Sequence, residues 1–293
     1  MNMSLLNRIS KLVQDPPPSI VLEFSEAGIA YSVGGETGFA VLEPGALVPS
    51  PTQDNIHRAD VLSGLLSRVI PASEAKKTQP AVVILPDYAV RISVLDFDSF
   101  PSAPDEQLSL IRFRLKKTLP FDVEAAVVSY FVQGPPKKDA KAGGKVEVVA
   151  ATVALEVLAR YEALCRAAHL HPGEITTSAL AVLSLCDAAG AVVIAKLAGR
   201  TLTVMVVVDH KLKLFRCIEM EGTTELDVLS VLQPTLAYVE DELSSPGCRL
   251  ILCGFANGAL PGLERSREAL RSGAGQLHAF NAGLLGYLEG ARN

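Results

Sequence analysis

The segment SIVLEFSEAG, residues 19–28, contains residue types that could bind a phosphate group. It begins as a short apolar strand, carries Glu23 near the end of that strand, and continues into a turn with Ser25 and Gly28. An acidic residue before a Gly- or Ser-containing turn is typical of nucleotide-binding folds, because backbone N–H groups there can approach phosphate oxygens. The turn therefore either binds a phosphate or keeps only the shape of a phosphate turn.

Motifs that would define a common enzyme class are absent from the sequence. The patterns G-x-S-x-G, H-E-x-x-H and G-x-x-x-x-G-K-[ST] do not occur, and no nucleophile is paired with a base. Cys165, His169 and His171 have the spacing C-x3-H-x-H, which we interpret as a buried thiol and two solvated imidazoles at a helix end. We expect no metal and no cofactor, with ATP as the alternative.

Composition and charge exclude several classes of partner. The formal net charge is -5, Trp is absent and aromatic residues make up 5%, so neither a basic face nor stacking platforms for nucleic acid are expected. Five cysteines without a C-x-x-C spacing indicate reduced thiols in a cytoplasmic protein. With 293 residues, 49% of them hydrophobic, the chain can build one large domain or two ordinary ones.

The sequence predicts neither a signal peptide nor a membrane-spanning helix. The most apolar window, residues 179–199, is interrupted by Asp187, Gly190 and Lys196, so we interpret it as a buried helix followed by a buried strand. Residues 4–13 have the pattern of an amphipathic helix, which a proline-rich linker follows up to residue 18. This helix either docks on the body of the protein or lies on a membrane or partner.

Two strand-rich blocks of the sequence follow the same plan. Residues 19–47 and 191–219 each predict a meander of three strands, and each block is followed by a predicted helix. This order indicates a structural duplication without a detectable sequence repeat. The remaining predicted elements are two strands within 80–98, a helix over 105–119, strands over 125–134 and 144–153, a helix over 154–173, a strand, turn and helix over 249–273, and a closing helix over 281–293.

Several stretches of the chain resemble the PilM family of type IV pilus assembly proteins, an actin-like branch related to FtsA and to the cytoplasmic part of GspL. The stretch from VVILPDYAVRISVLDFD through VVSYFVQG, and the later KVEVVAATVALEVLARYEALCRAAHLHPGEI, are similar to the subdomain that this family inserts, called 1C. LILCGFANGALPGL and NAGLLGYLEG are similar to its C-terminal lobe. The resemblance implies an α/β fold with two duplicated, ribonuclease H-like lobes that close on a nucleotide.

The resemblance also implies the division of the chain into domains. An inserted 1C-like α/β subdomain is expected within the first lobe, and subdomain 2B of the second lobe is expected to be reduced or missing. The predicted units are the N-terminal helix and linker (1–18), the first part of lobe 1, called 1A (19–80), the 1C-like insert (81–170), the return to lobe 1 (171–190) and lobe 2, called 2A (191–293).

In this family's fold, two turns with a D-x-G pattern hold the phosphates. Glu23 and Ser25 stand in the Asp and Gly places of the first turn, and Lys196 and Ala198 stand in those of the second. A lysine cannot bind a cation, and a Cβ at each Gly place crowds the backbone. The nucleoside turn, which includes Gly254 and Asn257, carries a bulky Phe255. We therefore predict a degenerate site without hydrolysis, with ATP binding without turnover as the alternative.

The function implied by the resemblance is that of a cytoplasmic scaffold, peripheral at the inner membrane. It would bind the N-terminal tail of a PilN-like bitopic protein in a groove between 1A and 1C, and contact other pilus platform proteins. Arg112, Arg114, Lys116 and Lys117 lie on the helix near the expected groove, where they either bind the tail or only balance the helix dipole. The alternatives are a working actin-like ATPase or filament former, and a GspL-like component of type II secretion.

Overall fold

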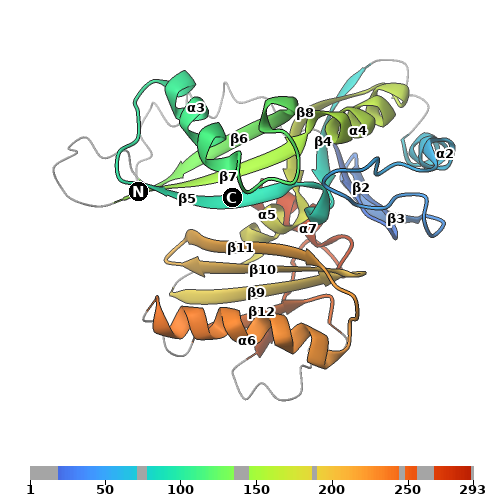
Figure 1. Ribbon diagram of the computed structural model, residues 1–293. Helices are drawn as coiled ribbons and strands as arrows, with labels where there is room; N and C mark the ends of the chain where they lie inside the picture. Colours follow the sequence, from blue (N-terminus) through green and yellow to red (C-terminus); the bar gives the residue numbers. More distant parts are fainter. Residues whose placement is uncertain are drawn as a thin grey trace, which may run out of the picture.

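A computed structural model describes residues 19–70, 78–134, 145–186, 190–243, 248–255 and 267–291. The strands in these residues form two sheets of five strands and one sheet of three (Figure 1). The helix predicted within residues 4–13 lies outside the described residues, as does Asn257 of the predicted nucleoside turn.

The first five-stranded sheet has the order β3-β2-β1-β4-β8. Strands β1, β2 and β3 form the predicted antiparallel meander, while β4 pairs parallel with β1 and β8 pairs parallel with β4. All five residues of β1 are buried, which is typical of a central strand covered on both faces. The strands are β1 (Ile20–Phe24), β2 (Gly28–Val33), β3 (Glu36–Val41), β4 (Gln79–Leu85) and β8 (Leu170–Thr177).

The second five-stranded sheet repeats this arrangement, with the order β11-β10-β9-β12-β13. Helix α2 (Ala59–Val69) joins β3 to β4, and helix α6 (Glu225–Asp241) takes the equivalent place between β11 and β12. The predicted duplication is therefore present in the order of strands and helices. The strands are β9 (Ala191–Ala198), β10 (Thr201–Val208), β11 (Lys211–Glu219), β12 (Arg249–Cys253) and β13 (Arg267–Ala269).

An insert between β4 and β8 forms the three-stranded sheet, in the order β5-β7-β6. Its strands are β5 (Arg91–Phe97), β6 (Ala126–Gln133) and β7 (Val146–Ala154), all antiparallel. Helix α3 (Pro104–Leu115) covers one face, where its Ile111 and Leu115 are fully buried. Helix α4 (Leu155–Ala167) then returns the chain to the first sheet, as Figure 1 shows.

Three predicted boundaries differ from the structure. Residue 81, predicted to begin the insert, lies inside β4, because residues 81–84 pair with β1 of the first sheet. The helix predicted over 154–173 ends at Ala167, and Pro172 lies in β8. Proline is tolerated there because β8 is an edge strand and its register shifts at that point. Residues 267–269, predicted as helix, form β13.

The C-terminal helix α7 (Ala282–Gly290) packs closely against helix α5 (Ser178–Val182). A Cβ at Gly283 would clash with Ser178, and a Cβ at Gly286 would clash with the backbone of Ala181. The two glycines are three residues apart, so they face the same neighbour and allow this close approach. As a result α7 reaches the first sheet, where Leu284 is buried.

Among the helices that the structure describes, none is long and apolar enough to cross a bilayer.

Candidate functional site

The carboxylate of Glu23 is buried between the two halves of the chain. Glu23 is the last but one residue of the central strand β1, and it is 1% exposed. The hydroxyl of Ser178 donates to its Oε1, and the backbone N–H of Leu284 donates to its Oε2 at 2.7 Å. A third donor is the N–H of Gly283, at 3.3 Å from Oε1. The carboxylate thus occupies the N-terminus of α7, where the helix dipole favours negative charge.

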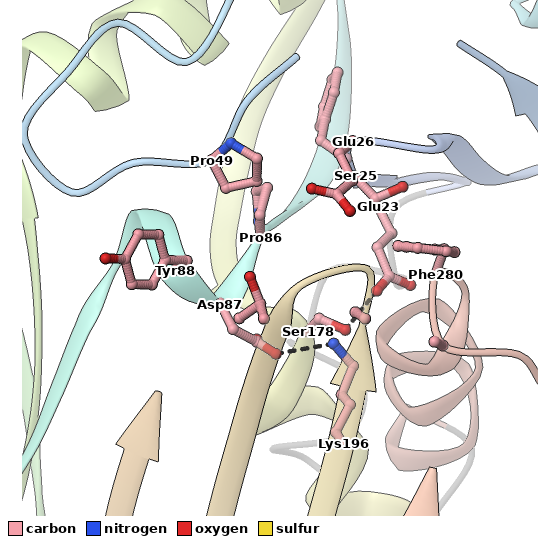
Figure 2. A pocket seen from close by; sticks show the side chains of 14 residues that line it. Glu23, Ser25, Glu26, Pro49, Pro86, Asp87, Tyr88, Ser178, Lys196 and Phe280 are labelled. Atoms are coloured by element: carbon pink, nitrogen blue, oxygen red, sulfur yellow. Dashed lines mark hydrogen bonds and ion pairs between the residues drawn. The ribbon is translucent and has the colours of Figure 1, made fainter. Parts of the chain in front are cut away.

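A buried ion pair joins the first half of the chain to the second. The ammonium group of Lys196, from β9, lies 2.8 Å from Oδ2 of Asp87, and the two side chains are 3% and 2% exposed. Asp87 lies in the turn between β4 and β5 (Figure 2). Its Oδ1 accepts from the N–H of Ala179 at 2.6 Å, and its Oδ2 also accepts from the hydroxyl of Thr203 at 3.2 Å. The Asp87 carboxylate therefore accepts from helix α5 on one side and from the second sheet on the other.

The electrostatic balance of this crevice keeps the lysine charged. Burial alone would lower the pKa of Lys196, but Asp87 and then Glu23 raise it above its usual value. Burial also raises the pKa of Glu23, against the opposing effects of Lys196 and of the Ser178 hydrogen bond. The ammonium group is paired with Asp87 and further stabilised by the nearby Glu23, so it is the counter-ion of the protein's own side chains.

The turn between β9 and β10 is also filled by a side chain from the other half. Gly199 has a φ of +56°, and any side chain there would clash with the carboxylate of Glu26. Burial and then Glu219 raise the pKa of Glu26, while Arg200 and its backbone hydrogen bond to Glu26 lower it. A carboxylate from the first lobe therefore lies against the turn that would face a phosphate.

The first predicted phosphate turn is closed by its own hydroxyl. The Oγ of Ser25 donates to the carbonyl of Gly28 at 2.8 Å and accepts from the N–H of Gly28 at 3.1 Å. At the predicted nucleoside turn, Gly254 has a φ of +82° and approaches the carbonyl of Leu197 so closely that a Cβ would clash. The backbone of the first turn is thus bonded within the protein, and Gly254 is packed closely against β9.

The cavity that remains in the crevice has a volume of about 30 Å³. Glu23, Ser25, Lys196 and Ala198 all line it, so the structure brings together the predicted residues of the two phosphate turns (Figure 2). A water molecule has a share of about 30 Å³ in the liquid, so this volume suits one or two waters. Within the described residues, no cluster of three or more His, Cys, Asp or Glu side chains could hold a metal ion.

The four cations predicted to bind a partner lie on or just after α3. Arg112 donates to the carbonyls of Val123 and Ala126, at 2.6 and 3.2 Å, so it anchors the end of the helix to the start of β6. The guanidinium group of Arg114 lies over the ring of Phe97. The remaining two, Lys116 and Lys117, are exposed in the turn after the helix.

An apolar groove of about 420 Å³ lies between the first sheet and the face of the small sheet that α3 does not cover. Residues 129–131 of β6 and 175–177 of β8 line it. Successive strand residues point to opposite faces, so three in a row line one groove only where the strand edge itself faces it. Each of the two strands is the last in its sheet among the described residues. The groove therefore presents two strand edges beside apolar side chains.

Sequence reasoning missed Asp87 and Glu26 and all residues of the groove. The one local signal for Asp87 is an acidic residue directly after a buried strand, the same signal that drew attention to Glu23. The groove has no local signal, because its walls come from β6 and β8, which are about 40 residues apart in the chain. None of the four predicted cations lines this groove, and their binding role stays a prediction.

The two equivalent sheets, the insert and the crevice between the halves define an actin-like fold. No protein-family model and no curated protein sequence matches the chain. The solved structure of a PilM-PilN type IV pilus biogenesis complex superposes with a TM-score of 0.68, at 15% identity, over 95% of this chain and 100% of that chain. The predicted resemblance to the PilM fold is confirmed.

A second solved structure has the same fold. It is the cytoplasmic domain of EpsL, an inner-membrane component of the type II secretion system of Vibrio cholerae. It superposes with a TM-score of 0.52, at 12% identity, over 94% of each chain. At such low identities the two likenesses establish the fold of the chain, and its function has to be argued from the site.

Proposed function

We propose that this chain is a non-catalytic scaffold of a type IV pilus assembly platform, located in the cytoplasm at the inner membrane. In this role it binds the N-terminal tail of a PilN-like membrane protein in the apolar groove between the first sheet and the small sheet. The fold shared with the PilM-PilN complex supports the platform, since that complex pairs PilM with PilN. The apolar groove supports the proposal that the partner is a peptide.

The observation that carries the proposal is the pair of strand edges that line the groove. An extended peptide can satisfy its backbone hydrogen bonds on such an edge, while alternate side chains enter apolar pockets. Phe131 of β6 is 54% exposed and Val127 is 40% exposed at this place, although both are apolar. Exposed apolar groups beside an unpaired strand edge are typical of a binding surface.

The test is the affinity of a fluorescent peptide with the sequence of a PilN-like cytoplasmic tail, measured by anisotropy. We expect Phe131→Glu to weaken binding by about tenfold or more, since a charge would be buried in an apolar groove. Phe113→Glu is the matched control, because Phe113 is 73% exposed on α3, on the other face of the small sheet. Equal affinity of the wild type and Phe131→Glu would reject the groove as the tail site.

The binding role of the cations on and just after α3 is tested separately. Lys116→Glu with Lys117→Glu leaves the packing of the helix intact, because both side chains are exposed. Weaker tail binding in this double variant would assign them to the partner site, and unchanged binding would leave them as charges that balance the helix dipole. Contacts with further platform proteins, and a membrane contact through residues 4–13, belong to the same proposal.

The absence of catalysis is proposed from the contents of the crevice. A cavity of about 30 Å³ does not admit a nucleotide, and the lysine that could meet phosphate is paired with Asp87. The test is titration with a fluorescent ATP analogue and Mg²⁺, together with phosphate release. We expect neither binding nor release at micromolar protein. Micromolar affinity with turnover would favour the actin-like ATPase, and ATP-dependent pelleting would favour a filament former.

A component of a type II secretion platform is the second candidate, because the EpsL cytoplasmic domain shares the fold. The likeness to the PilM-PilN complex is closer by TM-score, 0.68 against 0.52. Tail peptides from a PilN-like protein and from a type II secretion inner-membrane protein, compared in the same anisotropy assay, separate the two candidates.

A further inference from the structure

We propose that a second cleft, between the small sheet and the second sheet, docks an acidic segment of a partner protein. The cleft has a volume of about 370 Å³ and lies where the first residues of β5 approach the middle of β11. Its lining includes Arg91, Ser93, Thr118, Leu119, Phe215 and Arg216. It shares no lining residue with the interlobe cavity, and it shares only Val90 with the apolar groove.

The charge of this cleft is one-sided. Two arginines line it and no aspartate or glutamate does. Within the described residues, neither Arg91 nor Arg216 forms an ion pair with a carboxylate. The cleft is therefore locally positive in a chain where acidic residues outnumber basic ones by 32 to 27. The partner that complements them is an anion.

One of the two arginines is already held in place. The guanidinium group of Arg91 stacks over the ring of Tyr88, 5.0 Å from its centroid. Tyr88 belongs to the short helical turn Asp87–Ala89, and that turn is fixed by the ion pair between Asp87 and Lys196. A guanidinium group that is already ordered loses less conformational entropy when it bonds to a carboxylate. More of the interaction free energy then contributes to affinity.

Apolar side chains in the same cleft favour a peptide over a small anion. Leu119 and Pro120 come from the turn after α3, and Phe215 from β11. A segment with both acidic and apolar residues would bond to the two arginines and cover this apolar wall. Lys116 and Lys117 are exposed and directly precede Thr118, which lines the cleft, so they extend the positive potential along the chain towards it. Clusters of arginine are a known mode of recognising acidic motifs.

The probe is a fluorescein-labelled peptide EELEELEEL, and its glutamine counterpart QQLQQLQQL serves as the uncharged control. Anisotropy is measured with the wild-type protein and with Arg91→Gln/Arg216→Gln. We expect the double variant to bind the acidic peptide about tenfold or more weakly, because two charge-assisted contacts are lost. The protein control is Arg68→Gln/Lys145→Gln, which removes two exposed cations that line neither the groove nor the cleft.

The single variant Arg216→Gln provides a test that does not depend on the packing of Arg91, since Arg216 is exposed. We expect an intermediate loss of affinity with an unchanged melting temperature. Equal binding of the acidic and glutamine peptides, or equal binding by the wild type and the double variant, would overturn the proposal. Binding of phosphatidylserine vesicles that requires Arg91 and Arg216, together with no binding of the acidic peptide, would also overturn the proposal. Tail binding at Phe131 is measured separately, so the two proposals fail independently.

Discussion

Replacing Lys196 by methionine tests whether the two halves of the chain are held together by an internal charge pair. Methionine keeps most of the length and the apolar part of the lysine side chain and removes its charge. Asp87 and Glu23 then remain buried without a cation, although each keeps neutral donors. The reciprocal variant Asp87→Asn leaves the Lys196 ammonium beside Glu23 and retains one amide oxygen for the N–H of Ala179.

The expected cost follows from the burial of the pair. Both side chains are at most 3% exposed, so solvent screens them little. Removing one partner of a buried pair typically costs about 3–5 kcal/mol, because the other charge is left uncompensated. We expect Lys196→Met and Asp87→Asn each to lose stability in this range. The double variant leaves neither charge of the pair, so it should lose less than the two single losses added, with a coupling of roughly 1–3 kcal/mol.

The assay is urea unfolding followed by circular dichroism, since the chain has no Trp to report by fluorescence. Losses below about 1 kcal/mol in both single variants, with no coupling, would refute the reasoning, since that is the value of a solvated surface pair. A pH series adds a second test. The folded pKa of Lys196 is raised above 10.5, so its contribution is present below pH 10.5 and is lost as the pH rises through the folded value. The stability difference between wild type and Lys196→Met should therefore shrink at alkaline pH.

Two further substitutions test the packing of the first lobe. Gly286→Ala should destabilise by about 1–3 kcal/mol in urea unfolding, because the new Cβ would clash with the backbone of Ala181 in α5. Gly64→Ala, on α2 with open space around it, is the control and should be neutral or stabilising by roughly 0.5–1 kcal/mol. Tyr161→Phe should cost about 1–3 kcal/mol, because the buried Oδ1 of Asn55 loses its donor at 3.1 Å; a loss below about 0.5 kcal/mol would mean that water replaces it.

Most of the fold could be predicted from hydrophobic patterns. The meanders at 20–41 and 191–219, the helices α2 and α6, and the two strands around Pro86 all appear where alternation or helical periodicity placed them. The failures occurred where tertiary context overrode a local signal. The helix predicted over 154–173 includes Pro172, but the edge strand β8 accommodates this residue, which has no N–H to donate.

The candidate sites were predictable to different degrees. The phosphate turns were found because each lies at the end of a strand, and the structure does bring Glu23 and Lys196 into one crevice. The resemblance implied a tail groove between 1A and 1C with the helix over 105–119 near it, but α3 covers the face of the small sheet that is turned away from the apolar groove. Val128 and Tyr130 face the helix while Val127 and Phe131 face the groove, and alternation along β6 does not tell which face meets the first lobe.

The crevice contains more internal acid than base, which bears directly on the proposed loss of nucleotide chemistry. Glu23 and Asp87 place two carboxyl groups around the ammonium group of Lys196, and Glu26, which also meets Arg200, adds a third carboxyl group at the β9–β10 turn. A triphosphate would bring further negative charge into the same place, where the buried Lys196 is already paired. Binding would require the halves to separate and the pair of Asp87 and Lys196 to break. The groups that hold the lobes together are therefore the same groups that oppose a nucleotide, and this supports a rigid scaffold over an ATPase cycle.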